Sequence, residues 1–324
     1  MAPTEHPLHL CAPFNNLSGT AKKALREADV ILSLDWIDLG GALQLAGEAG
    51  PLKATVIHAG QDINLHNGFG KEHLALPALD VHLFGDADAA VEELLAALGT
   101  VPPMPMPAAK AIPAEPGEHL NLRHVAQALA AATGEQPVTF ATLGRGWPID
   151  IWPHRHPLDY LGKDGGGGLG SGPGLTLGAA LALRDSDRLT VGMLGDGDTL
   201  MGINALWSAA HSNIPVLVIV ANNRSYYNDE LHQEGVALKR GRDPANRWIG
   251  QSIDRPAPDI ARLAEGQGWM GIGPVTKVAE LGDVMKRAIE CVRAGKPCLV
   301  DVHIDARHGR NLRESMQVRG TESL

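Results

Sequence analysis

The sequence predicts an α/β protein, with open parallel sheets that carry helices on both faces. Helical segments alternate with short apolar, β-rich runs along most of its 324 residues. This alternation is typical of parallel strands joined by helical crossovers. A proline-rich linker at residues 101–117 interrupts it, because proline fits neither a helix interior nor a central strand. We therefore expect a smaller N-terminal part and a larger C-terminal part.

The smaller part, residues 1–100, contains helix and strand patterns in turn. We expect helices at residues 18–28 and 88–98, and buried strands at residues 29–34 and 54–58. Two or three strands are few for a self-sufficient doubly wound sheet. This part therefore corresponds to an incomplete domain that leaves apolar surface exposed.

The larger part, residues 118–306, continues the alternation and is followed by a tail at residues 307–324. The predicted helices cover residues 121–132, 172–183, 204–211, 258–266 and 279–293, and the strands cover 138–142, 189–194, 216–220 and 298–304. Ligands of open parallel sheets bind beyond the carboxyl ends of the strands. The residues that follow the strands are therefore the first candidates for a functional site.

Composition excludes several classes of function. The net charge is −9 with dispersed acidic residues, which argues against nucleic acid or an anionic membrane as the main partner. Cys11, Cys291 and Cys298 show no metal-ligand or redox spacing, which fits a reducing cytosol. The N-terminus lacks a signal-peptide pattern, and no apolar stretch approaches the ~20 residues of a membrane span. We expect a soluble cytoplasmic protein.

Two strand ends carry polar residues suited to a metal and a phosphate. Gly195, Asp196, Gly197 and Asp198 follow one predicted strand, and the next strand ends in an Asn pair whose second member is Asn223. A carboxylate and an amide oxygen are hard ligands of the kind that Mg²⁺ prefers. The glycines allow backbone N–H groups to approach a phosphate, and the following helix directs its positive N-terminus at the anion.

This pattern resembles the thiamine diphosphate motif, in which GDG is followed downstream by NN. Asn223 follows Asp196 by 27 residues, the family's usual separation. Two ordinary strand-to-turn junctions are the alternative, since Gly, Asp and Asn are common in turns, but they explain neither the pairing nor the spacing. The resemblance implies a thiamine diphosphate-binding fold that holds thiamine diphosphate and Mg²⁺. It also implies that Asp196, Asn223 and the backbone carbonyl of Ser225 are the metal ligands from protein.

The glycine-rich segment at residues 165–174 precedes a predicted helix. It matches neither a Walker loop nor a dinucleotide fingerprint, and a flexible linker is the plain alternative. In the resembled family, a large apolar residue between glycines lies under the cofactor and wedges its two rings into a V shape. Leu169 corresponds to that residue, with Gly167 beside it.

Two further residues near the motif have open roles. Tyr226 either lines the substrate side of the cofactor site or packs at the start of a helix. Asp198 stands where the family often has a small residue, and its carboxylate would repel a diphosphate. We expect it to cap a helix and to offer the diphosphate only its backbone N–H.

His154 and His156 form an H-x-H pair, a spacing that zinc sites use. No third ligand clusters with them, and Pro153 and Pro157 indicate a surface loop. We expect a structural role for the pair, with an active-site role for His156 as the alternative.

The resemblance extends over most of the chain, to the family of acetolactate synthase and benzoylformate decarboxylase. Residues 6–100 resemble the second half of the central domain, and residues 117–305 the diphosphate-binding domain. The pyrimidine-binding domain, whose glutamate activates the cofactor, has no counterpart. The segment at residues 34–38, Leu-Asp-Trp-Ile-Asp, departs from the family's flavin-binding pattern and argues against FAD.

The resemblance implies one subunit of a split enzyme, with a second subunit that carries the pyrimidine-binding domain in a heterotetramer. A truncated longer chain is the rival explanation. The implied activity is lyase or carboligase chemistry next to a carbonyl, either 2-oxo acid decarboxylation or acyloin-type carboligation. Cleavage of a 2-hydroxyacyl-CoA is an alternative, and a non-catalytic regulatory module is another. The substrate would be a 2-oxo acid, an aldehyde or an acyl-CoA.

Overall fold

The computed structural model describes residues 3–10, 17–36, 39–48, 50–61, 77–99, 104–105, 114–144, 146–162 and 168–305. The chain divides into two compact units, one of Met1–Glu5, Ala109–Lys163 and Gly168–Leu324, and the other of His6–Ala108 and Asp164–Gly167. The unit changes within the predicted linker. Cys11, residues 37 and 38, most of the linker, Gly167 and the tail at residues 307–324 lie outside the described residues.

The larger unit is built on a five-stranded sheet in the order β4-β5-β6-β8-β7. All neighbouring strands run parallel. The strands are β4 (Val138–Thr142), β5 (Leu189–Gly195), β6 (Leu217–Asn222), β7 (Met270–Val275) and β8 (Cys298–His303). β5 and β6 are buried almost throughout, as expected for central strands of a parallel sheet.

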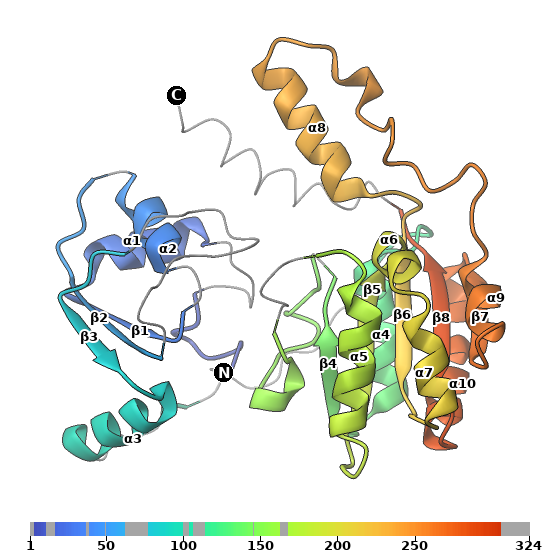
Figure 1. Ribbon diagram of the computed structural model, residues 1–324, viewed down its shortest axis with the longest axis horizontal. Coiled ribbons are helices and arrows are strands. Elements are labelled where there is room, and N and C mark those ends of the chain that lie inside the picture. The colour runs from blue at the N-terminus through green and yellow to red at the C-terminus, as the bar shows by residue number, and fades with distance from the viewer. Residues whose placement is uncertain are drawn as a thin grey trace. The chain divides into compact units, whose positions relative to one another are not determined.

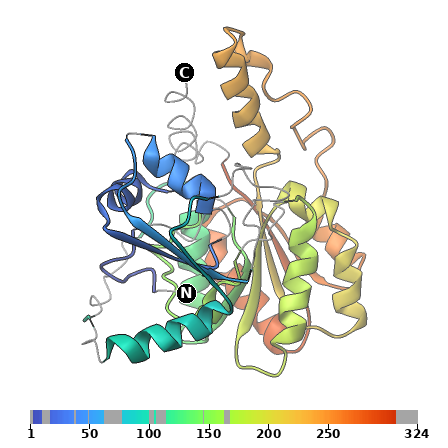
Figure 2. The same cartoon turned by 60° about the vertical axis from the view of Figure 1, so that its left-hand side comes forward.

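Helices cover both faces of this sheet (Figure 1 and Figure 2), which confirms the predicted fold class. One face packs against α4 (Leu122–Thr133) and α10 (Leu281–Arg293), which form one apolar core with inward residues of the strands. The other face packs against α5 (Ser171–Ala182), α7 (Ala205–His211) and α9 (Ile260–Glu265) around a second core. Among the described residues, no helix is long and apolar enough to cross a membrane.

Two helices begin at the carboxyl edge of the sheet, at its upper end in Figure 1. The short helix α6 (Asp196–Met201) follows β5 directly, and α8 (Tyr227–Lys239) follows β6 after a turn. The described part of the unit also contains three short 3₁₀ turns, η1 (Pro157–Asp159), η2 (Pro244–Asn246) and η3 (Val278–Glu280). The sequence patterns did not predict α8 or β7. β7 contains two glycines and a proline, which disfavour a strand on propensity alone.

The smaller unit contains a three-stranded parallel sheet in the order β1-β2-β3. Its strands are β1 (Val30–Leu34), β2 (Thr55–Gly60) and β3 (Val81–Phe84), and its helices are α1 (Gly19–Glu27), α2 (Leu39–Gly47) and α3 (Ala87–Leu98). The sequence patterns did not predict α2 or β3. α2 contains three glycines, which lower its helix propensity.

One face of the small sheet carries exposed apolar residues on its two outer strands. The prediction of β1 as a buried strand is wrong, because only Ile31 and Ser33 are buried whereas Val30, Leu32 and Leu34 are exposed. On β3, Val81 and Leu83 are also exposed. The strand register places the exposed residues of both strands on one face, since side chains alternate along a strand. We call these five residues the open sheet face.

Candidate functional site

The candidate site lies where β5 and β6 end side by side. Gly195 pairs with Ala221 in the register of the two strands, so the residues after them meet at the same edge of the sheet. The backbone N–H of Ser225 donates to Asp196 Oδ2 at 3.1 Å and to Asn223 Oδ1 at 3.0 Å. The three predicted metal ligands are therefore brought together around one N–H group. We call Asp196, Asn223 and Ser225 the strand-end clamp.

Asp196 is the charged member of the clamp, and its side chain is buried. Burial raises the pKa of the Asp196 carboxyl to about 6, although N–H groups of Gly197 and Ser225 act in the opposite direction. A buried carboxylate beside an amide oxygen is a favourable position for a cation. The oxygen donors of the clamp fit Mg²⁺, which takes few protein ligands and completes its shell with phosphate oxygens and water.

The clamp does not depend on a cluster of ionisable ligands. In the described ranges, no group of three or more His, Cys, Asp or Glu residues could hold a metal ion. A cation at the clamp would therefore depend on the mixed set of carboxylate, amide and backbone oxygens.

A surface hollow lined by Trp269, Arg287 and Lys296 lies before β7 and β8, at the opposite, amino edge of the sheet, where we predicted no site residue.

The turn between β6 and α8 is held by a residue that the sequence reasoning missed. Asn222 is buried, and its Nδ2 donates to Asp301 Oδ1 on β8 at 3.0 Å. Its Oδ1 accepts from the backbone N–H of Arg224 at 3.0 Å. Arg224 has a left-handed conformation, with φ of 59°, and its Nη1 lies 3.2 Å from His303 Nδ1. A charged residue inside the apolar run of β8 was the available sequence signal for Asp301.

The two glycines of the GDG motif lie in different surroundings. A Cβ at Gly195 would meet no atom within 4 Å, so open space lies beside the clamp. A Cβ at Gly197 would overlap the ring of Tyr226. The close approach of this ring therefore requires glycine at 197, and Tyr226 packs at the start of α8, as one of its two expected roles describes.

Asp198 caps a helix with its side chain, and the helix is α5 rather than its own. Its Oδ1 accepts from the backbone N–H groups of Gly170, at 2.6 Å, and Gly172, at 3.3 Å. Gly170 is the N-cap residue of α5 and has φ of 93°. The carboxylate of Asp198 is thus engaged by the glycine-rich segment, and its role toward a diphosphate stays a prediction.

Leu169 directly precedes this capped helix start. It is 52% exposed, and the N–H of its neighbour Gly170 is one of those held by Asp198. Gly167 lies outside the described residues. The structure thus presents Leu169 as an accessible side chain beside a fixed helix start, and the wedge role stays a prediction.

The two histidines of the H-x-H pair have opposite surroundings, so the expected surface loop is wrong for His154. His154 is 0% exposed, and its ring stacks on Tyr160 at 5.7 Å between centroids. His156 is exposed and caps η1, with its Nδ1 accepting from the N–H of Leu158. Burial lowers the pKa of His154, and the Asp159 carboxylate partly opposes that shift.

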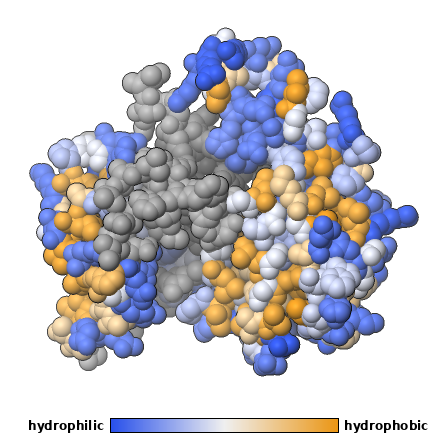
Figure 3. Space-filling model, viewed as in Figure 1, coloured by the Kyte–Doolittle hydropathy of each residue, from blue (hydrophilic) through white to orange (hydrophobic). Residues whose placement is uncertain are grey.

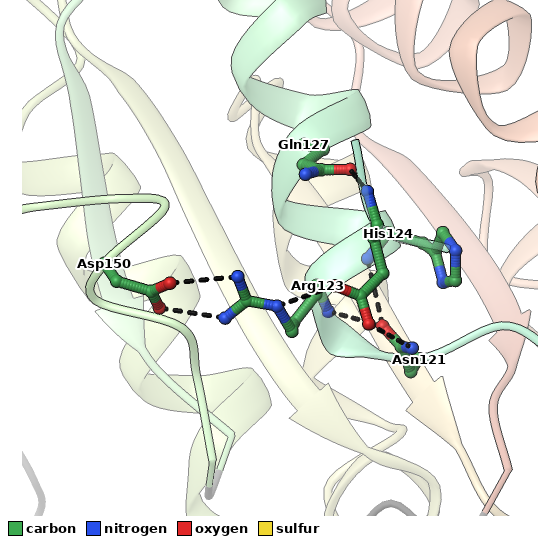
Figure 4. A network of polar contacts seen from close by, with 6 residues as sticks. Asn121, Arg123, His124, Gln127 and Asp150 are labelled. Atoms are coloured by element: carbon green, nitrogen blue, oxygen red, sulfur yellow. Dashed lines mark hydrogen bonds and ion pairs between the residues drawn. The ribbon is translucent and has the colours of Figure 1, made fainter. Parts of the chain in front are cut away.

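The loop that follows β4 is anchored to the start of α4 by ion pairs (Figure 4). Arg123 on α4 pairs with Glu115 through Nε at 2.8 Å and with Asp150 through Nη2 at 2.9 Å. The hydrogen bond from Arg123 lowers the pKa of Asp150. Asn121 caps α4 by accepting from the N–H groups of Arg123 and His124. This network fixes the segment that leaves the carboxyl end of β4.

The larger unit is similar to known cofactor-binding domains. Residues 144–302 match the profile of a family described as thiamine pyrophosphate enzyme, C-terminal TPP binding domain. Over 169 residues, the chain is 32% identical to the acetolactate synthase isozyme 3 large subunit of Escherichia coli (strain K12), which covers 52% of this chain and 27% of that protein. Over 156 residues, it is 30% identical to benzoylformate decarboxylase of Pseudomonas aeruginosa, which covers 46% of this chain and 25% of that protein.

These matches span about a quarter of the length of the curated relatives. The fold is shared more widely. The solved structure of a thiamine diphosphate-dependent 4-hydroxybenzoylformate decarboxylase of Rhodococcus jostii RHA1 resembles this chain with a TM-score of 0.67 and 24% identity. That likeness covers 94% of this chain and 54% of the decarboxylase chain.

Proposed function

We propose that the chain is the diphosphate-binding subunit of a thiamine diphosphate- and Mg²⁺-dependent enzyme, because its residues 144–302 match the C-terminal TPP-binding domain family of thiamine pyrophosphate enzymes. The reaction is lyase or carboligase chemistry next to a carbonyl. Decarboxylation of a 2-oxo acid, or the related acyloin-type carboligation, is the first choice. The observation that carries the proposal is the strand-end clamp, in which one N–H group joins Asp196 and Asn223.

Each clamp residue has a distinct part in this proposal. Asp196 supplies the negative charge that holds Mg²⁺, Asn223 supplies its amide oxygen, and Ser225 supplies its backbone carbonyl. The open space beside Gly195 leaves room for the diphosphate near the N-terminus of α6. Thiamine diphosphate, when bound, supplies the electron sink that such reactions need. The protein fixes its diphosphate end and leaves Leu169 free to contact the rings.

We propose that a second polypeptide completes the site, because the family's activating glutamate belongs to a pyrimidine-binding domain. Two exposed apolar surfaces support such a partner. In the larger unit, Leu175, Leu181, Met201 and Trp207 are exposed on α5, α6 and α7, and Figure 3 shows hydrophobic residues over that side of the unit. In the smaller unit, the five residues of the open sheet face are exposed. Patches of this kind are typical of interfaces, and a twofold assembly with two copies of each chain follows common symmetry.

Two alternatives belong to the same domain family. Cleavage of a 2-hydroxyacyl-CoA would use the same clamp with a different substrate pocket. A non-catalytic module would hold the cofactor, or nothing, and regulate a partner. The intact set of oxygen donors at the clamp favours an enzyme over a module, because a module without cofactor would have no need of a buried carboxylate at this edge.

Calorimetry tests the clamp. We expect the full chain to bind thiamine diphosphate with Mg²⁺ and to lose that binding with excess chelator. Asp196→Ala and Asn223→Ala should each abolish Mg²⁺-dependent binding, because a ligand is removed from a site with few protein ligands. Ser186→Ala, in an exposed loop before β5, serves as the control and should bind as the wild type does. Undiminished affinity in both clamp variants would show that the cofactor does not bind there.

Reconstitution tests the partner and the reaction. The isolated chain should be inactive with any cofactor, and co-purification with a partner that carries a pyrimidine-binding domain should restore turnover. A screen of 2-oxo acids, aldehydes and acyl-CoAs would then separate decarboxylase, carboligase and lyase. Turnover of a 2-oxo acid by the isolated, monodisperse chain would refute the need for a partner.

A further inference from the structure

A chain of polar contacts runs from β8 to the strand-end clamp. Asp301 accepts from Asn222, Asn222 accepts from the N–H of Arg224, and the Arg224 guanidinium contacts His303. His303 Nε2 also lies 3.7 Å from Asp301 Oδ2. These contacts connect Asp301, Asn222, Arg224 and His303. None of the four belongs to the set of ligands derived from the motif.

Asp301 is an unusual residue for its position in the sheet. It lies on β8 between β6 and β7, pairs with Val220 in the register, and is 2% exposed. A Cβ at Gly273 on β7 would lie 2.8 Å from Asp301 Cβ, so β7 approaches residue 301 as closely as glycine allows. Burying a carboxylate is costly unless it is hydrogen-bonded. Asp301 therefore places a carboxylate where burial costs free energy. We infer that this carboxylate has a role that an aliphatic side chain could not fill.

The role follows from the chemistry of the Asn222 amide. An ionised carboxylate can only accept hydrogen bonds, so the Asn222 atom that faces Asp301 must be the NH₂ group. The amide oxygen is then turned toward the N–H of Arg224, 3.0 Å away. Asp301 thus fixes which way round the Asn222 amide lies.

The orientation of Asn222 in turn holds a strained turn. Arg224 has a left-handed conformation, which costs free energy in a residue with a side chain. Its N–H bond to Asn222 and its contact with His303 hold it there. Directly after this bend, the N–H of Ser225 reaches Asp196 Oδ2 and Asn223 Oδ1. The bend at Arg224 is therefore what closes the turn over the clamp.

We propose that Asp301 is a positioning residue for the strand-end clamp. Asp301 acts through Asn222 and the bend at Arg224, without touching the metal or the cofactor. The functional meaning of this role rests on the proposed function. Removal of Asp301 would leave the Asn222 NH₂ group buried without its acceptor and would free the turn at residues 222–225. Mutation of residues that orient metal ligands by hydrogen bonds, without touching the metal, typically lowers metal affinity about 10- to 100-fold.

The first measurement needs no cofactor. Hydrogen–deuterium exchange of the full chain, followed by mass spectrometry, reports the amides of Arg224 and Ser225. Asp301→Ala should speed their exchange by at least about tenfold, since these donors lose fixed acceptors. Asp301→Asn keeps an acceptor oxygen of the same shape and should remain close to the wild type. Asp159→Ala is the matched control, because Asp159 is engaged by Arg188, just before β5, at the opposite edge of the sheet. It should lower stability without changing exchange at the turn.

The second measurement is calorimetric binding of thiamine diphosphate with Mg²⁺ to the same variants. Asp301→Ala should weaken Mg²⁺-dependent affinity about 10- to 100-fold, with recovery in Asp301→Asn and no change in Asp159→Ala. Unchanged exchange at Arg224 and Ser225 in Asp301→Ala overturns the inference, whatever the cofactor does. Unchanged affinity in a chain that binds cofactor also overturns it. A wild-type chain that binds no cofactor, together with accelerated exchange in Asp301→Ala, instead refutes the proposed function and leaves Asp301 as the residue that holds the turn.

Discussion

The carboxylate of Asp198 holds the backbone N–H of Gly170 at 2.6 Å. This bond ties the first turn of α6 to the glycine-rich segment before α5, two pieces of chain that are 28 residues apart. A Cβ at Gly172 would overlap the same carboxylate, so the segment approaches Asp198 as closely as glycine allows. The carboxylate of Asp198 is therefore directed at the start of α5, where two backbone N–H groups donate to it.

We predict that Asp198→Ala lowers the free energy of unfolding by about 1–3 kcal/mol, the usual loss when hydrogen bonds to a charged group are removed. Asp198→Asn should cost less, because its amide oxygen can still accept from Gly170. Urea denaturation of the three proteins measures the difference. Equal stability of Asp198→Ala and the wild type would show that these bonds contribute nothing to the α5 start.

A second prediction concerns the contact between Gly197 and Tyr226. Gly197→Ala should destabilise the chain by about 1–3 kcal/mol, because the added methyl group overlaps the Tyr226 ring and the surroundings are packed. The same change in a Tyr226→Ala background should cost much less. Denaturant titrations of the two single variants and the double variant measure the coupling, which we expect at about 0.5–3 kcal/mol. Additive effects would mean that the ring does not limit residue 197.

A third prediction concerns Leu169, whose side chain is half exposed. Leu169→Ala should leave thermal stability within about 0.5 kcal/mol of the wild type, as for most surface positions. If Leu169 wedges the cofactor rings together, the same variant should slow turnover of the reconstituted enzyme about 10- to 100-fold, because proton transfer between the rings depends on their proximity. Leu169→Met should be mild, since the exchange nearly conserves volume. Similar turnover in all three proteins would leave Leu169 as an ordinary loop residue.

The sequence predicted the structure best where the local residue pattern and the packing of the whole sheet favour the same element. β5 and β6 are apolar runs bounded by Gly, Asp and Asn, so both the strands and the polar residues at their ends could be predicted. The meeting of Asp196 with Asn223 followed from the rule that parallel strands end at one edge. The positions of these two residues could be predicted from the order of neighbouring elements alone.

Other features depend on contacts between distant residues and left little local trace. β7 carries Gly271 and Gly273 because the neighbouring chain comes close, at Ala261 and Asp301. The same glycines lower the β-propensity of the segment, so propensity did not predict this strand. Asn222 and Asp301 are 79 residues apart, and nothing local pairs them. His154 became a core residue through stacking with Tyr160, although its flanking prolines indicate a surface loop.

The buried ring of His154 makes the stability of the larger unit depend on pH. Neither ring nitrogen has a hydrogen-bond partner among the described residues, and burial lowers the pKa of the imidazole. The unfolded chain therefore binds a proton near the ordinary pKa of about 6.5, whereas the folded chain binds it only at lower pH. The neutral ring contributes fully above pH ~6.5, and this contribution is lost as pH falls through the folded pKa.

We predict that His154→Phe, which keeps an aromatic ring between Phe140 and Tyr160, removes this part of the pH dependence. Between pH 7 and pH 5, the wild type should lose free energy of unfolding relative to the variant, with a slope of at most about 1.4 kcal/mol per pH unit for one proton. Urea denaturation at several pH values measures the difference, and other titrating groups cancel because both proteins share them. His232→Gln, at an exposed position on α8, is the control for replacing a histidine outside the core, and its curve should run parallel to that of the wild type. Parallel curves for the wild type and His154→Phe would show that a proton reaches the His154 ring as readily in the folded chain as in the unfolded one.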